Sequence, residues 1–229
     1  MPPDQMAGIP LYRAAPTPRH RGFGHPFQAE LAELLAWRRD VRHFRTDPIP
    51  QAVIDRLLDL ACLAPSVGNS QPWRFVDVAT PERRAAIIAN YQSANAEALA
   101  GYRGERAALY ASLKLSGLKE APVHIAVFSD ETTGQGLGLG RKTMPETLRY
   151  SAVIAVHTLW LAARARGLGL GWVSILDPEA ATKALDVPET WSFIAYLCIG
   201  WPVEDHAEPE LQQRGWQSRE AACRQVLRR

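Results

Sequence analysis

The segment from Tyr150 to Arg166 constrains the fold more than any other part of the sequence, because its side chains are apolar almost all the way round a helix. Such a helix needs other elements to cover it in every direction. The segment therefore predicts a central helix that is buried within one chain or shared between two subunits. Gly167 follows directly, and a glycine there is typical of the residue that ends a helix.

Helices and short apolar strands follow one another along the rest of the chain, without an internal repeat or a low-complexity linker. This pattern predicts one α+β or mixed α/β domain over residues 28–229. Residues 1–27 hold six prolines and little periodicity, so we expect a proline-rich N-terminal arm that is loosely ordered unless it wraps a partner subunit. The expected helices cover 28–39, 50–64, 81–120, 150–166 and 178–185, and the expected strands cover 74–78, 123–128, 170–175 and 193–199.

Composition and charge exclude several classes of function. Apolar residues make up 47% and charged residues 22% of the chain, which is ordinary for a globular protein, and a net charge of +2 is too small to argue for nucleic-acid binding. The three cysteines match neither a disulfide framework nor a zinc site, so no metal is expected. Because the sequence has no charge-free apolar run of about 18 residues and no signal-like apolar core, we expect a cytoplasmic protein without a membrane partner.

Three arginines and one carboxylate occur within five residues, Arg38-Arg39-Asp40-Val41-Arg42, at the end of the first expected helix. Planar guanidinium groups suit phosphate and delocalised anionic rings. An aspartate among them is expected to stay ionised and to be held in one orientation. Taken alone, the cluster also fits a solvated, charged helix end, so its meaning depends on what the rest of the chain adds.

Three later segments add donors for the same kind of ligand. The proline-bracketed loop 64–73 carries hydroxyl and amide groups, the strand around 171–174 ends in a serine, and Arg219 supplies a late cation. Together with the arginine cluster, these residues are suited to an anion-bearing ligand. The residues alone identify that ligand no further.

Other motifs fail on spacing. The glycines of residues 134–140 stand at every second position, which fits neither a dinucleotide fingerprint nor a P-loop, so we expect a flexible connection there. No GxSxG elbow and no HExxH motif occur in the sequence. His157, inside the apolar helix, is expected to be a core residue rather than a ligand.

Motifs in a fixed order carry a resemblance to a known family. They are Arg-Arg-x-x-Arg at 38–42, Ala-Pro-Ser-x-x-Asn-x-Gln-Pro-Trp at 64–73, Gly-x-Gly-Trp-x-Ser at 169–174 and Gly-x-Pro at 200–202. Their order and spacing resemble the FMN-dependent nitroreductase superfamily over about residues 28–219. Within it, the chain is most similar to the 5,6-dimethylbenzimidazole synthase family of cobalamin biosynthesis. The features that point to this family are Asp40 and the segments 110–118, 159–164, 171–174 and 208–216.

The resemblance implies an α+β, nitroreductase-like fold with a mixed sheet flanked by helices, in a protein of the obligate-dimer type. The implied homodimer binds FMN at the subunit interface, with contacts from both chains. The region from Gly101 to Leu115 would form a lid that shuts the reduced flavin away from water. The implied FMN contacts are Arg38, Arg39, Asp40, Val41, Arg42, Ser66, Asn69, Gln71, Ser174 and Arg219, of which the arginines would hold the phosphate, the ribityl chain and the ring edge.

The resemblance also implies the reaction, in which FMN is consumed as a substrate. Reduced FMN, supplied from NAD(P)H by a separate flavin reductase, would react with dioxygen in the closed site. The products would be 5,6-dimethylbenzimidazole, the lower ligand of cobalamin, and a four-carbon sugar phosphate. Asp40 would act as a general base or proton shuttle, and Ser174 would hold the flavin for attack by oxygen.

Two other functions stay open at this point. Asn69 also fits the ordinary nitroreductases, in which NAD(P)H reduces FMN and a nitroaromatic or quinone accepts the electrons. Asp40 argues against them, because a small hydroxyl residue often stands at that place in those enzymes. A non-catalytic protein that stores or delivers reduced FMN would use the same arginines and Ser66, but neither Asp40 nor Ser174 would be necessary in it.

Overall fold

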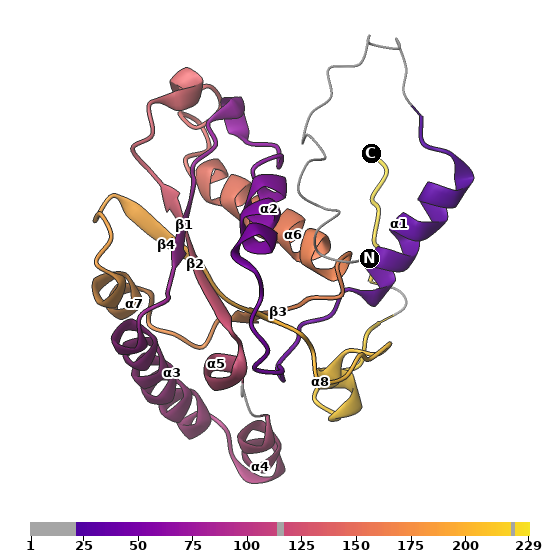
Figure 1. Cartoon of the computed structure of the whole chain (residues 1–229), viewed down its shortest axis with the longest axis vertical. Coiled ribbons are helices and arrows are strands. Elements are labelled where there is room, and N and C mark those ends of the chain that lie inside the picture. Colours follow the sequence, from indigo (N-terminus) through magenta and orange to yellow (C-terminus); the bar gives the residue numbers. More distant parts are fainter. Residues whose placement is uncertain (1–21, 114–116, 221–222) are drawn as a thin grey trace.

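The sheet at the centre of the computed structural model (Figure 1) has four strands in the order β1-β2-β4-β3. These are β1 (Trp73–Asp77), β2 (Val123–Asp130), β3 (Gly169–Val173) and β4 (Trp191–Gly200). Each neighbouring pair of strands is antiparallel, and a short parallel bridge between Asp40 and Leu170 extends the β3 edge. The α+β class and the nitroreductase-like arrangement of helices around one sheet are confirmed, but the four strands form an antiparallel sheet rather than the mixed sheet that the resemblance implies.

The structure describes residues 22–113, 117–220 and 223–229, so most of the predicted N-terminal arm lies outside the described residues. All four predicted strands are present, each within three residues of its expected ends. The helices are α1 (His25–Trp37), α2 (Gln51–Ala61), α3 (Pro81–Ala100), α4 (Gly104–Ser112), α5 (Gly117–Glu120), α6 (Thr147–Arg164), α7 (Pro178–Leu185) and α8 (Glu210–Gln213), with 3-10 turns η2 (Val67–Asn69) and η3 (Gln135–Gly138).

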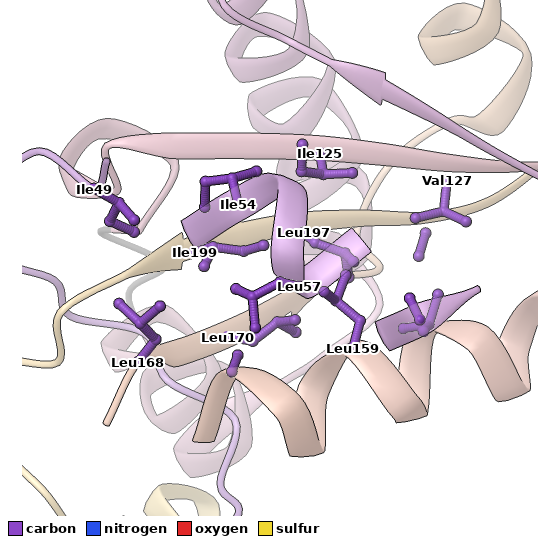
Figure 2. Packing of buried hydrophobic residues seen from close by; sticks show 14 residues of the cluster. Ile49, Ile54, Leu57, Ile125, Val127, Leu159, Leu168, Leu170, Leu197 and Ile199 are labelled. Atoms are coloured by element: carbon purple, nitrogen blue, oxygen red, sulfur yellow. The ribbon is translucent and has the colours of Figure 1, made fainter. Parts of the chain in front are cut away.

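Two hydrophobic clusters lie on opposite faces of the sheet, because successive side chains of a strand point to opposite sides. On β2, Ile125 and Val127 pack with α2 and α6, while Ala126 and Phe128 pack with α3, α5 and α7. Figure 2 shows the first cluster, in which Leu57 from α2 and Leu159 from α6 meet the sheet. Both faces of the sheet are therefore covered within a single protomer.

The central helix that the sequence predicts is α6, which packs against the sheet with one face only. Its opposite face carries Tyr150, Val153 and Ile154, which are exposed by 53%, 39% and 42%. An uncovered apolar face on the central helix is what a helix shared between subunits leaves in a single protomer. The buried face consists of Leu148, Ser151, Ala152, Ala155, Val156, Leu159 and Ala163.

Two sequence-based predictions about helices are wrong. His157 is exposed rather than buried, because it lies one turn beyond Val153 and Ile154 on the uncovered face of α6. The expected helix over 81–120 is divided into α3, α4 and α5. Its first break comes at Gly101, and Gly104, with φ +58°, begins α4 in a conformation that other residues rarely adopt.

A buried histidine makes the stability of the fold depend on pH. The ring of His124 lies 2.9 Å from Tyr196 Oη through Nδ1 and 3.2 Å from Ala121 O through Nε2. Burial, with the nearby Arg84 charge, lowers the pKa of His124 from 6.5 to about 4. The unfolded chain, with the ordinary pKa, therefore binds this proton more readily than the folded chain between pH 6.5 and 4.

The free energy of unfolding is therefore expected to fall as the pH drops through this window, by about 2 kcal/mol between pH 6.5 and 4.5. Urea denaturation of the wild type and of His124→Gln at both pH values measures the effect. The glutamine variant keeps a neutral polar side chain, so its stability should depend less on pH. An equal loss in both proteins would assign the pH dependence to other groups.

Candidate active site

The segment that follows α1 lies along the edge of β3 and is fixed to it by hydrogen bonds. Val41 N donates to Leu170 O at 3.1 Å, and Trp172 N donates to Asp40 Oδ1 at 2.9 Å. Glycine is required on the strand, because a Cβ atom on Gly171 would overlap the carbonyl oxygen of Val41. The Gly-x-Gly pattern of this strand therefore allows the arginine cluster to lie against the sheet.

Asp40 is anchored through both of its carboxylate oxygens. Oδ1 accepts from Trp172 N, and Oδ2 lies 3.4 Å from Nε of Arg42. Burial raises the pKa of the Asp40 carboxyl above its ordinary value, and the Trp172 N–H and Arg42 oppose this only in part. The carboxylate therefore has the fixed orientation expected from the sequence, and desolvation outweighs the single arginine that pairs with it in setting the direction of the pKa.

Further arginines near Asp40 add positive charge to this part of the site. Arg39 donates from its guanidinium to the carbonyls of Ala207 and Arg38, and its pKa is lowered by burial and by the charges of Arg38, Arg219 and Arg164. The ion pairs formed within the described residues include neither Arg38 nor Arg39 nor Arg219. A group of cations without paired carboxylates is suited to an anionic ligand.

A tryptophan on α6 supports this cluster, and sequence reasoning missed it. Trp160 Nε1 donates to Arg39 O at 3.1 Å, and the guanidinium of Arg38 lies 4.7 Å from the centre of the Trp160 ring. Stacking on an aromatic ring holds a guanidinium in place without neutralising its charge. The position of Trp160 in an apolar helix gave no sign of this role.

The loop between α2 and β1 holds the hydroxyl and amide residues expected to bind the ligand. Ser66 Oγ accepts from Gln71 N at 3.0 Å, and the loop is tied to α6 by a hydrogen bond from Val67 N to Ser151 Oγ at 3.0 Å. Asn69 and Gln71 are exposed and have φ values of +55° and +45°. The loop therefore presents both side chains to the surface from left-handed backbone.

The predicted site residues form two separate groups within one protomer. Arg38 and Arg39 contact Trp160 on α6, whereas the Ser66 loop contacts Ser151, nine residues earlier on the same helix. Nine residues correspond to roughly 14 Å along a helix. Arg219 belongs electrostatically to the first group, and Ser174 is exposed just beyond the end of β3.

A cavity of about 380 Å³ lies beside the arginine cluster, between it and residues 203–214. Glu210 lines this cavity, and its carboxylate lies 3.8 Å from Arg42 and 3.5 Å from Arg214. Glu210 belongs to the segment 208–216, one of those that indicate the family, but the sequence alone assigns it no role. The structure places it as the second carboxylate beside Arg42.

A model of the nitroreductase family matches residues 35–201, which is more than half of the chain. The chain belongs to the nitroreductase family. The matched region contains the arginine cluster, the Ser66 loop, the whole sheet and α6. The family resemblance that the motifs indicate is therefore confirmed.

Two known relatives show which members of the nitroreductase family this chain closely resembles in sequence. It is 62% identical over 197 residues to a 5,6-dimethylbenzimidazole synthase of Rhodospirillum rubrum, covering 86% of this chain and 93% of the relative. It is 53% identical over 187 residues to a 5,6-dimethylbenzimidazole synthase of Rhodobacter capsulatus, covering 82% and 90%. The closer resemblance within the superfamily, predicted from Asp40 and the later segments, is also confirmed.

The solved structure of iodotyrosine deiodinase bound to FMN and 3-iodo-L-tyrosine has the same fold as this nitroreductase-family chain. The TM-score is 0.67 at 24% identity, covering 86% of this chain and 97% of that one. Within the described part of the chain, no helix is long and apolar enough to cross a membrane. The same residues hold no group of three His, Cys, Asp or Glu side chains that could bind a metal.

The region expected to form a lid corresponds to α4, and its last residue, Leu115, lies outside the described residues. α4 has no buried side chain, and aromatic rings hold it in place. Tyr110 stacks on Tyr102 at 4.9 Å, and both rings contact Trp216 from the C-terminal segment. In this nitroreductase-family chain, the expected lid is therefore joined to the segment that carries Arg219.

Proposed function

We propose that this enzyme cleaves reduced FMN with dioxygen and releases 5,6-dimethylbenzimidazole. The observation that carries the proposal is Asp40, anchored by Trp172 N–H and Arg42 within the arginine cluster, in a chain 62% identical to a protein of that name. An ordinary electron-transferring nitroreductase has no need of a carboxylate at this point. A carboxyl held in one orientation beside the ligand is suited to accept and return a proton.

The residues present fit FMN. The charges of Arg38, Arg39 and Arg219 lie close together without carboxylate partners, which suits a phosphate. When bound, reduced FMN supplies an electron-rich ring that reacts with dioxygen. Asp40 would hold and move a proton beside that ring, Ser174 would donate a hydrogen bond to it, and Val41 and Arg42 would line its edge.

The site is completed by a second copy of the chain. Ser66, Asn69 and Gln71 lie too far along α6 to join the arginine cluster of their own protomer, and the uncovered face of α6 lies between the two groups. A homodimer packed on this apolar face would bring the loop of one protomer toward the cluster of its partner. FMN would then lie at the interface, in contact with both chains.

The electrons come from outside this protein. We propose that a separate flavin reductase uses NAD(P)H and delivers reduced FMN, with the reaction taking place in the cytoplasm, where free cysteines such as Cys62 persist. The lid, α4, would exclude bulk water while dioxygen reacts. Residues 1–27 would form an arm outside the FMN-binding domain of residues 28–229.

The proposal is tested by aerobic turnover of the purified protein with excess FMN, NADPH and an unrelated flavin reductase. Products are followed by chromatography and mass spectrometry. We expect 5,6-dimethylbenzimidazole to accumulate, and its formation to need both dioxygen and the reductase. If only oxidised FMN and peroxide are found, the proposal fails. Turnover of a nitroaromatic or quinone with NAD(P)H alone would then support an ordinary nitroreductase, and flavin binding without any turnover would support a carrier.

A further inference from the structure

The glycine-rich segment 134–140, which the sequence predicts to be a flexible connection, contains the turn η3 and contacts the Ser66 loop. Gly136, Gly138 and Gly140 have φ values of +79°, +78° and +79°, and η3 packs directly on η2. A Cβ atom on Gly136 would lie 2.6 Å from Gly68 O, and one on Gly140 would lie 2.7 Å from Val67 Cγ2. The glycines therefore allow two loops, far apart in the sequence, to touch through their backbones.

The loop on the other side of this contact is strained. Gly68, Asn69 and Gln71 all have positive φ, and two of these residues carry side chains. Non-glycine residues in the left-handed region persist only when their surroundings hold them there, and such strain is common at ligand-binding sites. Hydrogen bonds within the loop, such as the one from Gln71 N to Ser66 Oγ, fix part of this conformation, and a residue outside the loop can stabilise it further.

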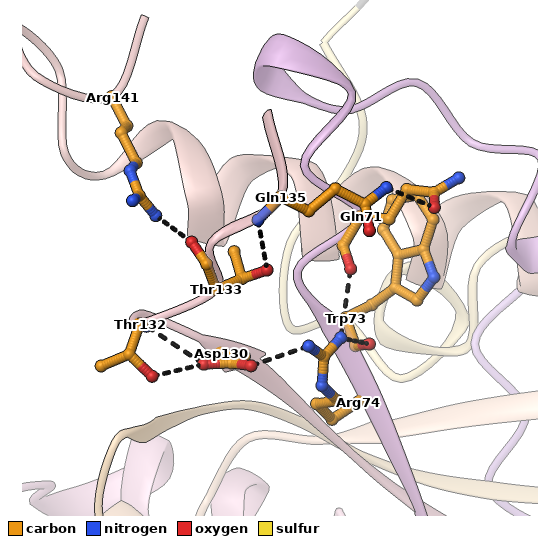
Figure 3. Close-up of polar contacts among 8 residues, drawn as sticks. All are labelled: Gln71, Trp73, Arg74, Asp130, Thr132, Thr133, Gln135 and Arg141. Carbon is orange, nitrogen blue, oxygen red and sulfur yellow. Dashed lines mark hydrogen bonds and ion pairs between the residues drawn. The ribbon is translucent and has the colours of Figure 1, made fainter. Parts of the chain in front are cut away.

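Gln135 is the residue in a position to do so. Its Nε2 donates to Asn69 O at 3.0 Å and to Gln71 Oε1 at 2.9 Å, as Figure 3 shows for Gln71. One amide group thus holds the backbone of one strained residue and the side chain of the other. These are the two exposed residues of the loop that we assign to the ligand.

The backbone of Gln135 is itself fixed by a series of polar contacts (Figure 3). Gln135 N donates to Thr133 Oγ1 at 3.4 Å, and Arg141 donates to Thr133 O at 2.6 Å. At the start of the same segment, Asp130 forms an ion pair with Arg74 at 2.7 Å, and Arg74 also donates to Gln71 O at 3.1 Å. Both ends of the strained loop are therefore connected to residues 130–141.

We infer that Gln135 is a positioning residue for flavin binding, which fixes Asn69 and Gln71 in the conformation that contacts the ligand. This inference rests on the proposed function for the identity of the ligand. Gln135 itself need not touch the flavin. Its effect passes through the strained loop, so it should be visible in the protein without flavin as well as in the binding of FMN.

The test compares Gln135→Met, which keeps the length of the side chain without a donor, with Gln135→Glu, which places a carboxylate against two oxygen atoms. Gln92→Ala, on the exposed side of α3, is the matched control. FMN affinity is measured by quenching of flavin fluorescence. We expect about tenfold weaker binding for the methionine variant, a larger loss for the glutamate variant, and no change for the control.

Hydrogen exchange of residues 66–72 in the flavin-free proteins is the second measurement. We expect faster exchange in both Gln135 variants and not in the control. With reduced FMN as substrate, KM should rise while kcat changes little, because Gln135 does not touch the reacting atoms.

Exchange that is unchanged in the variants would overturn the inference, since the loop would then be fixed by other contacts. Faster exchange with unchanged FMN affinity would also overturn it, because the loop conformation would not matter for the ligand. A wild-type protein that does not bind FMN would instead refute the proposed function, and with it the assignment of the ligand to this loop.

Discussion

Replacing Asp40 by asparagine is expected to lower the rate of 5,6-dimethylbenzimidazole formation at least about 100-fold, which is the usual effect of losing a general acid or base. The amide oxygen of asparagine can still accept from Trp172 N, so the segment should remain on β3 and FMN affinity should change little. The amide cannot accept and return a proton as a carboxyl group does. The measurement is product formation by chromatography, with FMN binding measured in parallel.

Asp47→Asn is the matched control for this variant. Asp47 lies seven residues further on, forms an ion pair with Arg45 at 3.3 Å and has a side chain that is 59% exposed. It should leave both the rate and the affinity unchanged. A fully active Asp40→Asn protein would show that the carboxyl takes no part in proton transfer, and a variant that no longer binds FMN would assign Asp40 to binding instead.

Replacing Gly171 by alanine is expected to lower the free energy of unfolding by about 3 kcal/mol or more, at the upper end of the range for overpacking. The added methyl group would overlap Val41 O, which is backbone and cannot rotate away. The segment that carries Asp40 would have to leave β3, so the hydrogen bond from Trp172 N would break as well. Urea denaturation and FMN binding should both show the loss.

Gly134→Ala is the control, because a Cβ atom at Gly134 meets nothing within 4 Å and its φ of −77° suits alanine. Its stability should match the wild type. If Gly171→Ala were as stable as the wild type and bound FMN equally well, the close contact between β3 and the arginine cluster would have no bearing on the site.

The sequence predicts the strands and the central helix well, because their apolar runs are bounded by clear signals. Asp177, for example, accepts from the backbone N–H groups of Glu179 and Ala180 at the start of α7, as a residue of its type does before a proline. The predictions that are wrong concern segments in which the polarity of the residues does not match their burial or does not show where a helix ends. The face of α6 at His157 is apolar in sequence and exposed in the protomer, and the polar region after α3 hides two helix breaks.

The sequence names candidate site residues, whose roles stay predictions, but it does not show the electrostatics of the place where they lie. The motifs named Asp40 and its arginines, yet only the structure shows that Arg42 alone pairs with the carboxylate while Arg38 stacks on Trp160. Sequence spacing carries no information on which neighbour a side chain faces, or on desolvation, which decides the direction of the Asp40 pKa. The role of Gln135 was hidden for the same reason, because its partners lie more than 60 residues earlier in the chain.

The separation of the arginine cluster from the Ser66 loop has a consequence for inheritance. If each site takes the arginine cluster from one chain and the Ser66 loop from the other, two copies of the gene with different mutations can complement each other. A hybrid of a chain damaged at Asp40 and a chain damaged at Asn69 would have one site with both defects and one with neither. A cell that makes both chains would keep part of the activity, although neither mutant chain is active alone. Two recessive mutations in the same gene would therefore complement each other.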